Sequence, residues 1–189
     1  MDYIILTFPR SGSNYLHELI KQKLRDPNNP DIPIDIPKTH SISESDGRKV
    51  ISIIRDPFDT MKSLITLALN FPENPEFAVE SGEVFKFPAN QYMETYSYII
   101  DNSDLIIDYR DLISRPNDVI DYLAQSMNLV VNKEEYVNEL FDSPNHLVSS
   151  TTSKLYNTIN YVKHLPGNGL AFACMNYYKG ALKKTIKFI

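Results

Sequence analysis

The chain has 189 residues, 42% of them hydrophobic, and a formal net charge of -5 at pH 7. This length and composition fit a single soluble globular domain covering residues 1–189. The negative charge argues against a protein that coats nucleic acid, because such proteins present a basic field, so an anionic ligand would need a local cluster of donors.

Cysteine content and hydropathy indicate the compartment. Cys174 is the only cysteine, which excludes an intramolecular disulfide and a cysteine-based zinc site and favours a reducing interior. The first apolar segment begins almost at Met1, so we expect no signal peptide, and no apolar run approaches the roughly 20 residues that span a bilayer. We therefore expect a cytoplasmic protein with no membrane partner.

The chain begins with a strand, a polar turn and a helix. Residues 2–8, DYIILTF, predict a buried strand, because β-branched and aromatic residues dominate them. The turn PRSGSN follows, and apolar residues at helical spacing then predict a helix that reaches Leu24. Ser13 or Asn14 could cap its first turn.

The same unit occurs a second time. Residues 26–37 carry four prolines and are predicted to be an extended connection that leads to KTH at 38–40. KVISII at 49–54 predicts a second buried strand. The following segment is predicted to be helical, with Asp56 as its cap and Pro57 at its first position.

The remaining elements complete an alternating pattern. Residues 71–88 have no period and predict a long surface excursion, followed by a helix over 90–100 and a short strand over 104–109. A helix over 115–129 and a basic-faced helix over 175–189 follow. Strands alternating with helices predict an α/β fold with a central parallel sheet flanked by helices.

The first polar turn has the composition of an anion site. In a parallel sheet, the turn from a strand to the next helix lies at the carboxyl edge, where ligands bind. The free N–H groups of the helix start attract anions, Arg10 adds a charge, and Gly12 allows close approach. Ser11, Ser13 and Asn14 add donors. The turn is therefore predicted to cradle a phosphate, although an ordinary capped helix start has the same short pattern.

Four segments together resemble the sulfotransferases that use 3'-phosphoadenosine 5'-phosphosulfate (PAPS). They are TFPRSGSNY at 7–15, KTH at 38–40, RDPFDTMKS at 55–63 and DYRDL at 108–112. The resemblance implies a P-loop-NTPase-like sulfotransferase fold. It also implies transfer of a sulfuryl group from PAPS, without a metal, to a hydroxyl or amine of a small-molecule, glycan or peptide acceptor.

The resemblance assigns the donor-binding residues by position. The first loop is similar to the family's 5'-phosphosulfate loop, with Arg10 in the place of a lysine and Tyr15 in the place of the tryptophan that stacks on adenine. Arg55 and Ser63 match the pair that holds the 3'-phosphate, and Tyr109 matches a tyrosine near adenine. The complete predicted set is Arg10, Ser11, Gly12, Ser13, Asn14, Tyr15, Arg55, Ser63 and Tyr109.

KTH carries the predicted chemistry. Sulfuryl transfer needs a base for the acceptor proton and cations for the charge on the transferring group and the leaving phosphate. Histidine titrates near neutral pH, and His40 matches the base of the family. Lys38 matches the lysine that steadies the sulfuryl oxygens, and Arg10 would act at the bridging oxygen.

Other interpretations of these segments stay open. A nucleoside or small-molecule kinase with a degenerate phosphate loop would need magnesium and an acidic ligand near the loop, and a non-catalytic nucleotide-binding module would have kept the cradle alone. His17 and Glu18 are rivals to His40 as the base, but both are expected to face solvent on the first helix. Lys179 and Gly180 are a weak match to a C-terminal phosphate motif, and the basic helix that holds them could serve a homodimer.

Overall fold

The computed structural model describes residues 2–45, 47–60, 63–64, 86–132 and 168–186. Its main sheet has four parallel strands in the order β4-β1-β5-β6. The strands are β1 (Tyr3–Thr7), β4 (Lys38–Thr39), β5 (Lys49–Ile54) and β6 (Leu105–Asp108). The predicted α/β fold with a central parallel sheet is confirmed, and KTH contributes an edge strand that the sequence did not predict.

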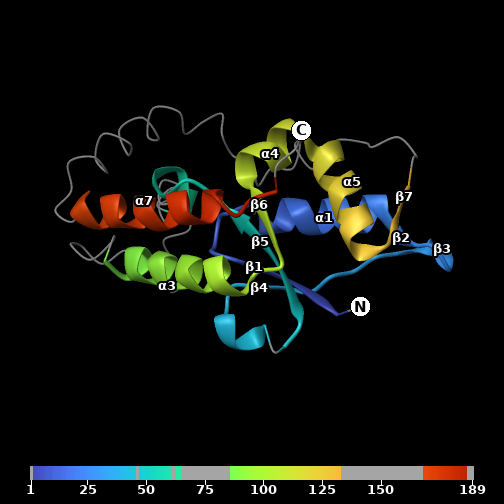
Figure 1. Ribbon diagram of the computed structural model, residues 1–189, viewed down its shortest axis with the longest axis horizontal. Helices are drawn as coiled ribbons and strands as arrows, with labels where there is room; N and C mark the ends of the chain where they lie inside the picture. The colour runs from blue at the N-terminus through green and yellow to red at the C-terminus, as the bar shows by residue number, and fades with distance from the viewer. Residues whose placement is uncertain (1, 46, 61–62, 65–85, 133–167, 187–189) are drawn as a thin grey trace, which may run out of the picture.

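The predicted extended connection after the first helix contributes to a second sheet. It has three antiparallel strands in the order β3-β2-β7, namely β2 (Leu24–Asp26), β3 (Asn29–Pro33) and β7 (Val130–Val131). The prediction that Leu24 continues the helix is wrong, because Leu24 pairs with Val131 in β2. These strands extend to one end of the molecule (Figure 1).

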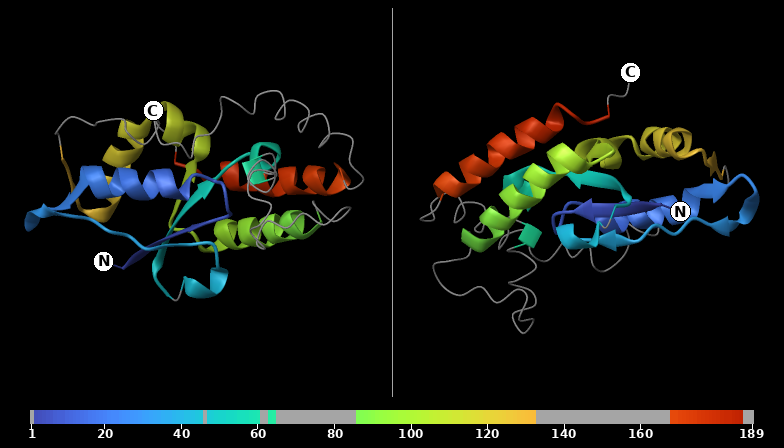
Figure 2. Two further views of the ribbon diagram at one scale, coloured as in Figure 1. Left: turned by 180° about the vertical axis from the view of Figure 1, so that it is seen from behind. Right: turned by 60° about the horizontal axis from the view of Figure 1, so that its bottom comes forward.

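The helices flank the main sheet on both sides. They are α1 (Ser13–Lys23), the short 3-10 helix η1 (Ile42–Glu44), α3 (Lys86–Asn102), α4 (Tyr109–Ser114), α5 (Pro116–Met127) and α7 (Asn168–Leu182). Helices α3 and α7 lie side by side in both views of Figure 2, while α1 and α5 lie together beyond them. Residues 57–60 are also helical.

The period of two along the strands divides the core between the faces of the sheet. Ile5, Ile51 and Ile107 pack in a cluster with apolar residues of α1 and α5. Phe8 and Ile106 pack in a second cluster with residues of α3 and α7. Because neighbouring strand residues face opposite ways, the continuous apolar runs of the strands indicate a sheet covered on both faces.

Several element ends differ from the sequence prediction, each for a local reason. The third strand ends at Asp108, whose carboxylate accepts a hydrogen bond from the Arg110 amide at 3.0 Å and so caps α4. The last helix spans 168–182 rather than 175–189, and the chain after it returns to the sheet, where the Ile186 amide bonds the Ile106 carbonyl at 3.0 Å. The predicted excursion at 71–88 lies mostly outside the described residues.

Candidate functional site

The carboxyl ends of all four parallel strands lead into residues that the sequence singled out. The loop Phe8–Gly12 follows β1, His40 follows β4, Arg55 follows β5, and Tyr109 follows β6. Because parallel strands end at one edge of the sheet, these segments meet there although they are far apart in sequence.

The loop after β1 is shaped by two residues with left-handed backbone. Gly12 has φ 103° and is the N-cap of α1, while Arg10 has φ 66°. The expectation that Ser13 or Asn14 caps this helix is wrong, because both lie inside it. Because the cap is a glycine, no side chain caps α1 by a hydrogen bond, and the start of a helix is a position that attracts anions.

Gly12 also allows a close approach by Tyr109. A Cβ atom at position 12 would lie 2.8 Å from Cδ2 of the Tyr109 ring, which is nearer than a carbon contact tolerates. A glycine is therefore needed here both for its backbone conformation and for its missing side chain.

Two arginines from different strand ends meet beside this glycine. Arg10 Nε donates to Ser63 Oγ at 3.0 Å, and an Arg55 NH group donates to the Arg10 carbonyl at 2.9 Å. The Arg55 guanidinium carbon lies 4.3 Å from the centre of the Tyr109 ring, in the geometry of a cation-π contact. The site thus brings together Arg10, Gly12, Arg55, Ser63 and Tyr109.

The charges of the two arginines repel each other. The Arg10 side chain keeps contact with solvent, but partial burial, and then the charge of Arg55, lower the pKa of Arg10, while Tyr109 acts in the opposite direction. Among the described residues, no carboxylate forms an ion pair with either arginine. An anionic ligand would relieve this repulsion, so the pair is suited to bind phosphate or sulfate groups.

Two buried polar atoms at the site have unused hydrogen-bonding capacity. Within the described part of the chain, Ser11 Oγ and Arg55 Nε are buried without a hydrogen-bond partner. Buried polar atoms are rarely left unpaired. Their presence beside an uncompensated pair of cations fits a site completed by an anionic ligand.

The ring of His40 is held in one orientation by the end of β1. Its Nδ1 atom lies 2.7 Å from the Thr7 carbonyl oxygen and 3.3 Å from Thr7 Oγ1. A carbonyl oxygen can only accept, so Nδ1 carries the hydrogen, and in the neutral ring Nε2 then keeps the lone pair. The side chain is exposed, and its Nε2 atom can therefore act as a proton acceptor.

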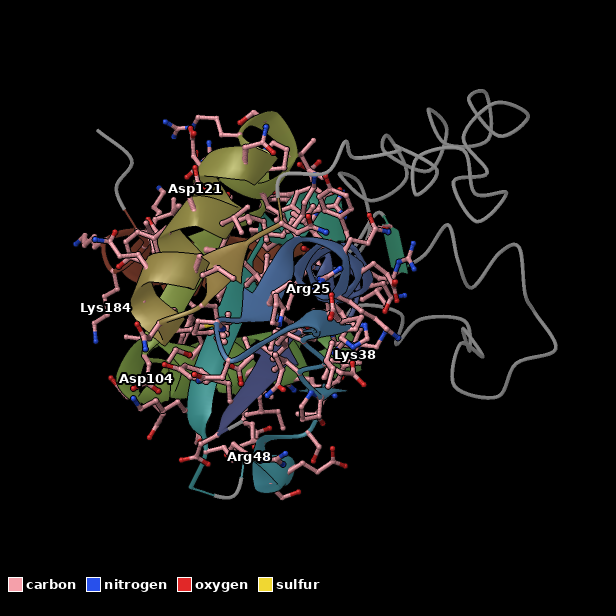
Figure 3. The ribbon with its side chains drawn as sticks, turned by 90° about the vertical axis from the view of Figure 1, so that its right-hand side faces the viewer. Arg25, Lys38, Arg48, Asp104, Asp121 and Lys184 are labelled. Atoms are coloured by element: carbon pink, nitrogen blue, oxygen red, sulfur yellow. The ribbon has the colours of Figure 1, made fainter. Side chains whose placement is uncertain are left out.

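Lys38 and Asn14 connect the KTH strand to the first helix. Lys38 Nζ donates to Asn14 Oδ1 at 2.6 Å, and Lys38 lies at the outside of the sheet edge (Figure 3). Tyr15 is half-buried and packs against the core cluster of α1 and α5. Its predicted contact with adenine stays a prediction.

His17 differs from the expectation that it faces solvent. Its side chain is only 16% exposed, with Nε2 2.8 Å from Asp35 Oδ1 and Nδ1 3.4 Å from Glu18 Oε1. Both ring nitrogens therefore face carboxylates. This arrangement links α1 to the segment that precedes β4.

Two tyrosines that the sequence pattern did not indicate also lie at the site. The hydroxyls of Tyr92 and Tyr96 both bond the backbone of Arg55, at distances of 2.7 to 2.9 Å. Their spacing of four residues in the predicted helix over 90–100 indicated a shared face. Nothing in the local pattern indicated that this face meets the end of β5.

Gly180, the weak match to a C-terminal phosphate motif, lies away from the strand ends described above. Gly180 lies on α7 facing α3, where an added Cβ would lie 3.3 Å from Ile100, so helix packing explains this glycine. No three His, Cys, Asp or Glu side chains of the described residues are placed to hold a metal ion. A search of the same residues finds no helix with the length and apolar character to cross a membrane.

Comparisons with known proteins find similarity among solved structures. No protein-family model matches the chain, and no curated protein matches it. Among solved structures, the chain is similar to mouse sulfotransferase SULT7A1 complexed with PAP, with 16% sequence identity and a TM-score of 0.46. The similarity covers 70% of this chain and 59% of the mouse chain, which is less than two thirds of the latter.

Proposed function

We propose that the protein transfers a sulfuryl group from PAPS to the hydroxyl or amine of an acceptor. The observation that carries this proposal is the pair Arg10 and Arg55, which reach one place from two strand ends without an ion-paired carboxylate among the described residues. A donor with anionic groups at both ends of its ribose requires a cation for each group, and each of the two strand-to-helix turns would provide one arginine.

The donor would be held by the residues that meet at the sheet edge. The N–H groups at the start of α1 and the Arg10 side chain would bind the 5'-phosphosulfate, with Ser11 Oγ as an additional donor. Arg55 and Ser63 would bind the 3'-phosphate. Ser63 already accepts a hydrogen bond from Arg10 Nε, so the two positions are connected through this pair.

Bound PAPS would supply an activated sulfuryl group. His40 Nε2 would take the proton of the acceptor as the acceptor oxygen or nitrogen bonds to sulfur and the bond from sulfur to the phosphate oxygen breaks. Lys38 would leave Asn14 and neutralise charge on the sulfuryl oxygens, and Arg10 would stabilise the leaving phosphate. The electron pair of the broken bond stays on that phosphate.

The same proposal includes an acceptor class, a cellular compartment and an assembly state. The acceptor would be a small molecule, a glycan or a peptide, and the reaction would take place in the cytoplasm. The chain would act as one domain. The basic C-terminal segment, of which α7 holds only Lys179, would be available for a homodimer.

The test is a calorimetric titration with 3'-phosphoadenosine 5'-phosphate (PAP), the spent donor, and in parallel with ADP and magnesium. We expect wild type to bind PAP and to prefer it over ADP. Arg55→Ala should weaken PAP binding by about 10- to 150-fold, because a lost charge-assisted contact to phosphate costs about 1.5–3 kcal/mol.

Arg48→Ala is the matched control for this substitution. Arg48 precedes the first residue of β5, at the opposite end of the strand from Arg55, and its guanidinium bonds the Glu44 carbonyl (Figure 3). The Arg48→Ala substitution should leave PAP binding unchanged. Preference for ADP with magnesium would overturn the proposal in favour of a kinase, and PAP binding without turnover of any acceptor would favour a non-catalytic binding module.

A further inference from the structure

We propose that Tyr96 is a positioning residue that anchors the backbone of Arg55 and so aims its guanidinium at the anion site. The inference rests on the proposed function for its consequence in donor binding. Its structural part concerns only the contacts between α3 and the end of β5.

Arg55 lies where the hydrogen-bond ladder of the sheet ends. The last paired residue of β5 is Ile54, which faces Asp108 of β6, and the pairing with β1 ends one residue earlier, at Ile53. The peptide groups of Arg55 therefore need partners other than a strand, because buried backbone groups are almost always paired.

The hydroxyls of α3 provide these partners. Tyr96 Oη accepts a hydrogen bond from the Arg55 amide at 2.7 Å and donates to the Arg55 carbonyl at 2.9 Å. Tyr92 Oη donates to the same carbonyl at 2.7 Å. A hydroxyl has one donor and two acceptor sites, so Tyr96 uses its donor and one acceptor on the two ends of a single residue.

Burial and ring packing fix the tyrosines themselves. Both side chains are fully buried, and burial raises the pKa of each, which keeps the hydroxyls protonated and able to donate. Their rings stack with centres 3.9 Å apart, and Phe8, at the start of the first loop, meets Tyr92 edge-on at 5.2 Å. The anchor of Arg55 is thus packed against the loop that carries Arg10.

Among the described residues, the guanidinium of Arg55 is held by parts of two other strand ends. Its guanidinium bonds the Arg10 carbonyl and lies on the Tyr109 ring. Both contacts depend on where the backbone places the side chain. Loss of the Tyr96 hydroxyl would leave the Arg55 amide without its partner, so the side chain would sample positions away from the ring.

The first experiment needs no ligand and follows the Arg55 side chain by NMR. Its resonances are assigned by their loss in Arg55→Ala, and contact with the Tyr109 ring should shift its proton signals upfield. Tyr96→Phe should remove most of this shift. Tyr98→Phe is the matched control, because Tyr98 lies on the same helix but bonds Ser45 Oγ at 2.7 Å instead. A full shift retained in folded Tyr96→Phe would overturn the inference.

The second experiment measures PAP affinity in a double-mutant cycle. Tyr96→Phe should weaken binding about tenfold in wild type and less than twofold in Arg55→Ala, because the hydroxyl acts through Arg55. Equal weakening in both backgrounds would overturn the inference in favour of a general effect on the fold. If Tyr96→Phe fails to fold, Tyr92→Phe, which removes one of the three bonds, is examined in the same two ways.

The two experiments separate the inference from the proposed function. If wild type does not bind PAP, the proposed function fails, and the NMR shift alone decides the role of Tyr96. If PAP binds and the shift is retained in Tyr96→Phe, the donor site stands and the positioning role is wrong.

Discussion

At the scale of single residues, Gly12 illustrates how one position serves the backbone and the site together. Its left-handed φ of 103° disfavours other residues, and its missing side chain lets Tyr109 approach to a distance at which a Cβ would clash. Gly47 also has a positive φ, of 76°, but nothing lies within 4 Å of the position of its absent Cβ. A side chain at position 12 would therefore meet both backbone strain and a steric clash, whereas a side chain at position 47 would meet backbone strain alone.

Gly12→Ala should both destabilise the protein and abolish PAP binding. We expect a loss of about 2–3 kcal/mol in the free energy of unfolding, because backbone strain and displacement of the Tyr109 ring add together. Gly47→Ala should cost about 1 kcal/mol from strain alone and leave PAP affinity unchanged. Urea denaturation and calorimetry measure the two effects, and intact PAP binding by Gly12→Ala would contradict the described loop.

His40→Ala should separate chemistry from donor binding. Loss of a general base reduces turnover by about 10²- to 10⁴-fold, whereas PAP affinity should stay within about twofold because the ring would bind the acceptor proton rather than the donor. The assay follows sulfuryl transfer to an acceptor panel. His17→Ala is the matched control, since His17 is paired with Asp35. If this control loses as much turnover as His40→Ala, the general base would be His17 on the first helix rather than His40.

At the scale of elements, α3 and α7 bring protonated groups together on one face of the sheet. Tyr92, Tyr96, Cys174 and Tyr178 are buried in their shared cluster. Burial raises the pKa of Cys174 to about 11 and, as its largest cause, that of Tyr178 to about 12. It also raises the pKa of the two α3 tyrosines. The packing of this helix pair therefore depends on these groups remaining neutral.

Stability should accordingly fall as the pH rises above about 9. Above the unfolded pKa values of 9.0 and 10.0, the unfolded chain releases protons that the folded chain keeps, so the free energy of unfolding decreases. The decrease should continue through the folded values of about 11 and about 12. Urea denaturation between pH 8 and pH 12 measures it, and Tyr178→Phe should make the decrease shallower.

Tyr177→Phe is the control for this pH dependence. Tyr177 is the neighbour of Tyr178 on α7 but is 37% exposed, so its substitution should leave the slope unchanged. A slope that is identical in wild type and Tyr178→Phe would show that Tyr178 does not contribute.

At the scale of the whole molecule, overall charge and local charge have opposite signs. The chain carries a net charge of -5, yet Arg10 and Arg55 meet at the carboxyl edge of one sheet, and Lys38 Nζ bonds Asn14 near the start of α1. The parallel topology causes this, because every parallel strand ends at the same edge and delivers its following turn there. An anionic ligand would thus be attracted by an arrangement of strands rather than by the composition of the chain.

Periodicity and turn chemistry by themselves determined much of this protein. The apolar runs at 2–8, 49–54 and 104–109 predicted three parallel strands, and Asp56 was rightly expected to cap the helix after the second, since its carboxylate accepts from the Phe58 amide at 2.9 Å. These patterns depend only on residues that are close in sequence, so they can be recognised without knowledge of the tertiary fold. The motif residues were selected by resemblance, and their roles stay predictions.

Tertiary structure alone decided the features that depend on distant segments. Leu24 is in a strand rather than in the helix because it pairs with Val131. The backbone of Arg55 is held in place because two tyrosine hydroxyls of α3 form hydrogen bonds to it at the end of β5. The orientation of His40 depends on a carbonyl 33 positions earlier in the chain. Such partners are chosen by the packing of the sheet and its helices, and a local sequence pattern contains no information about which segments will meet.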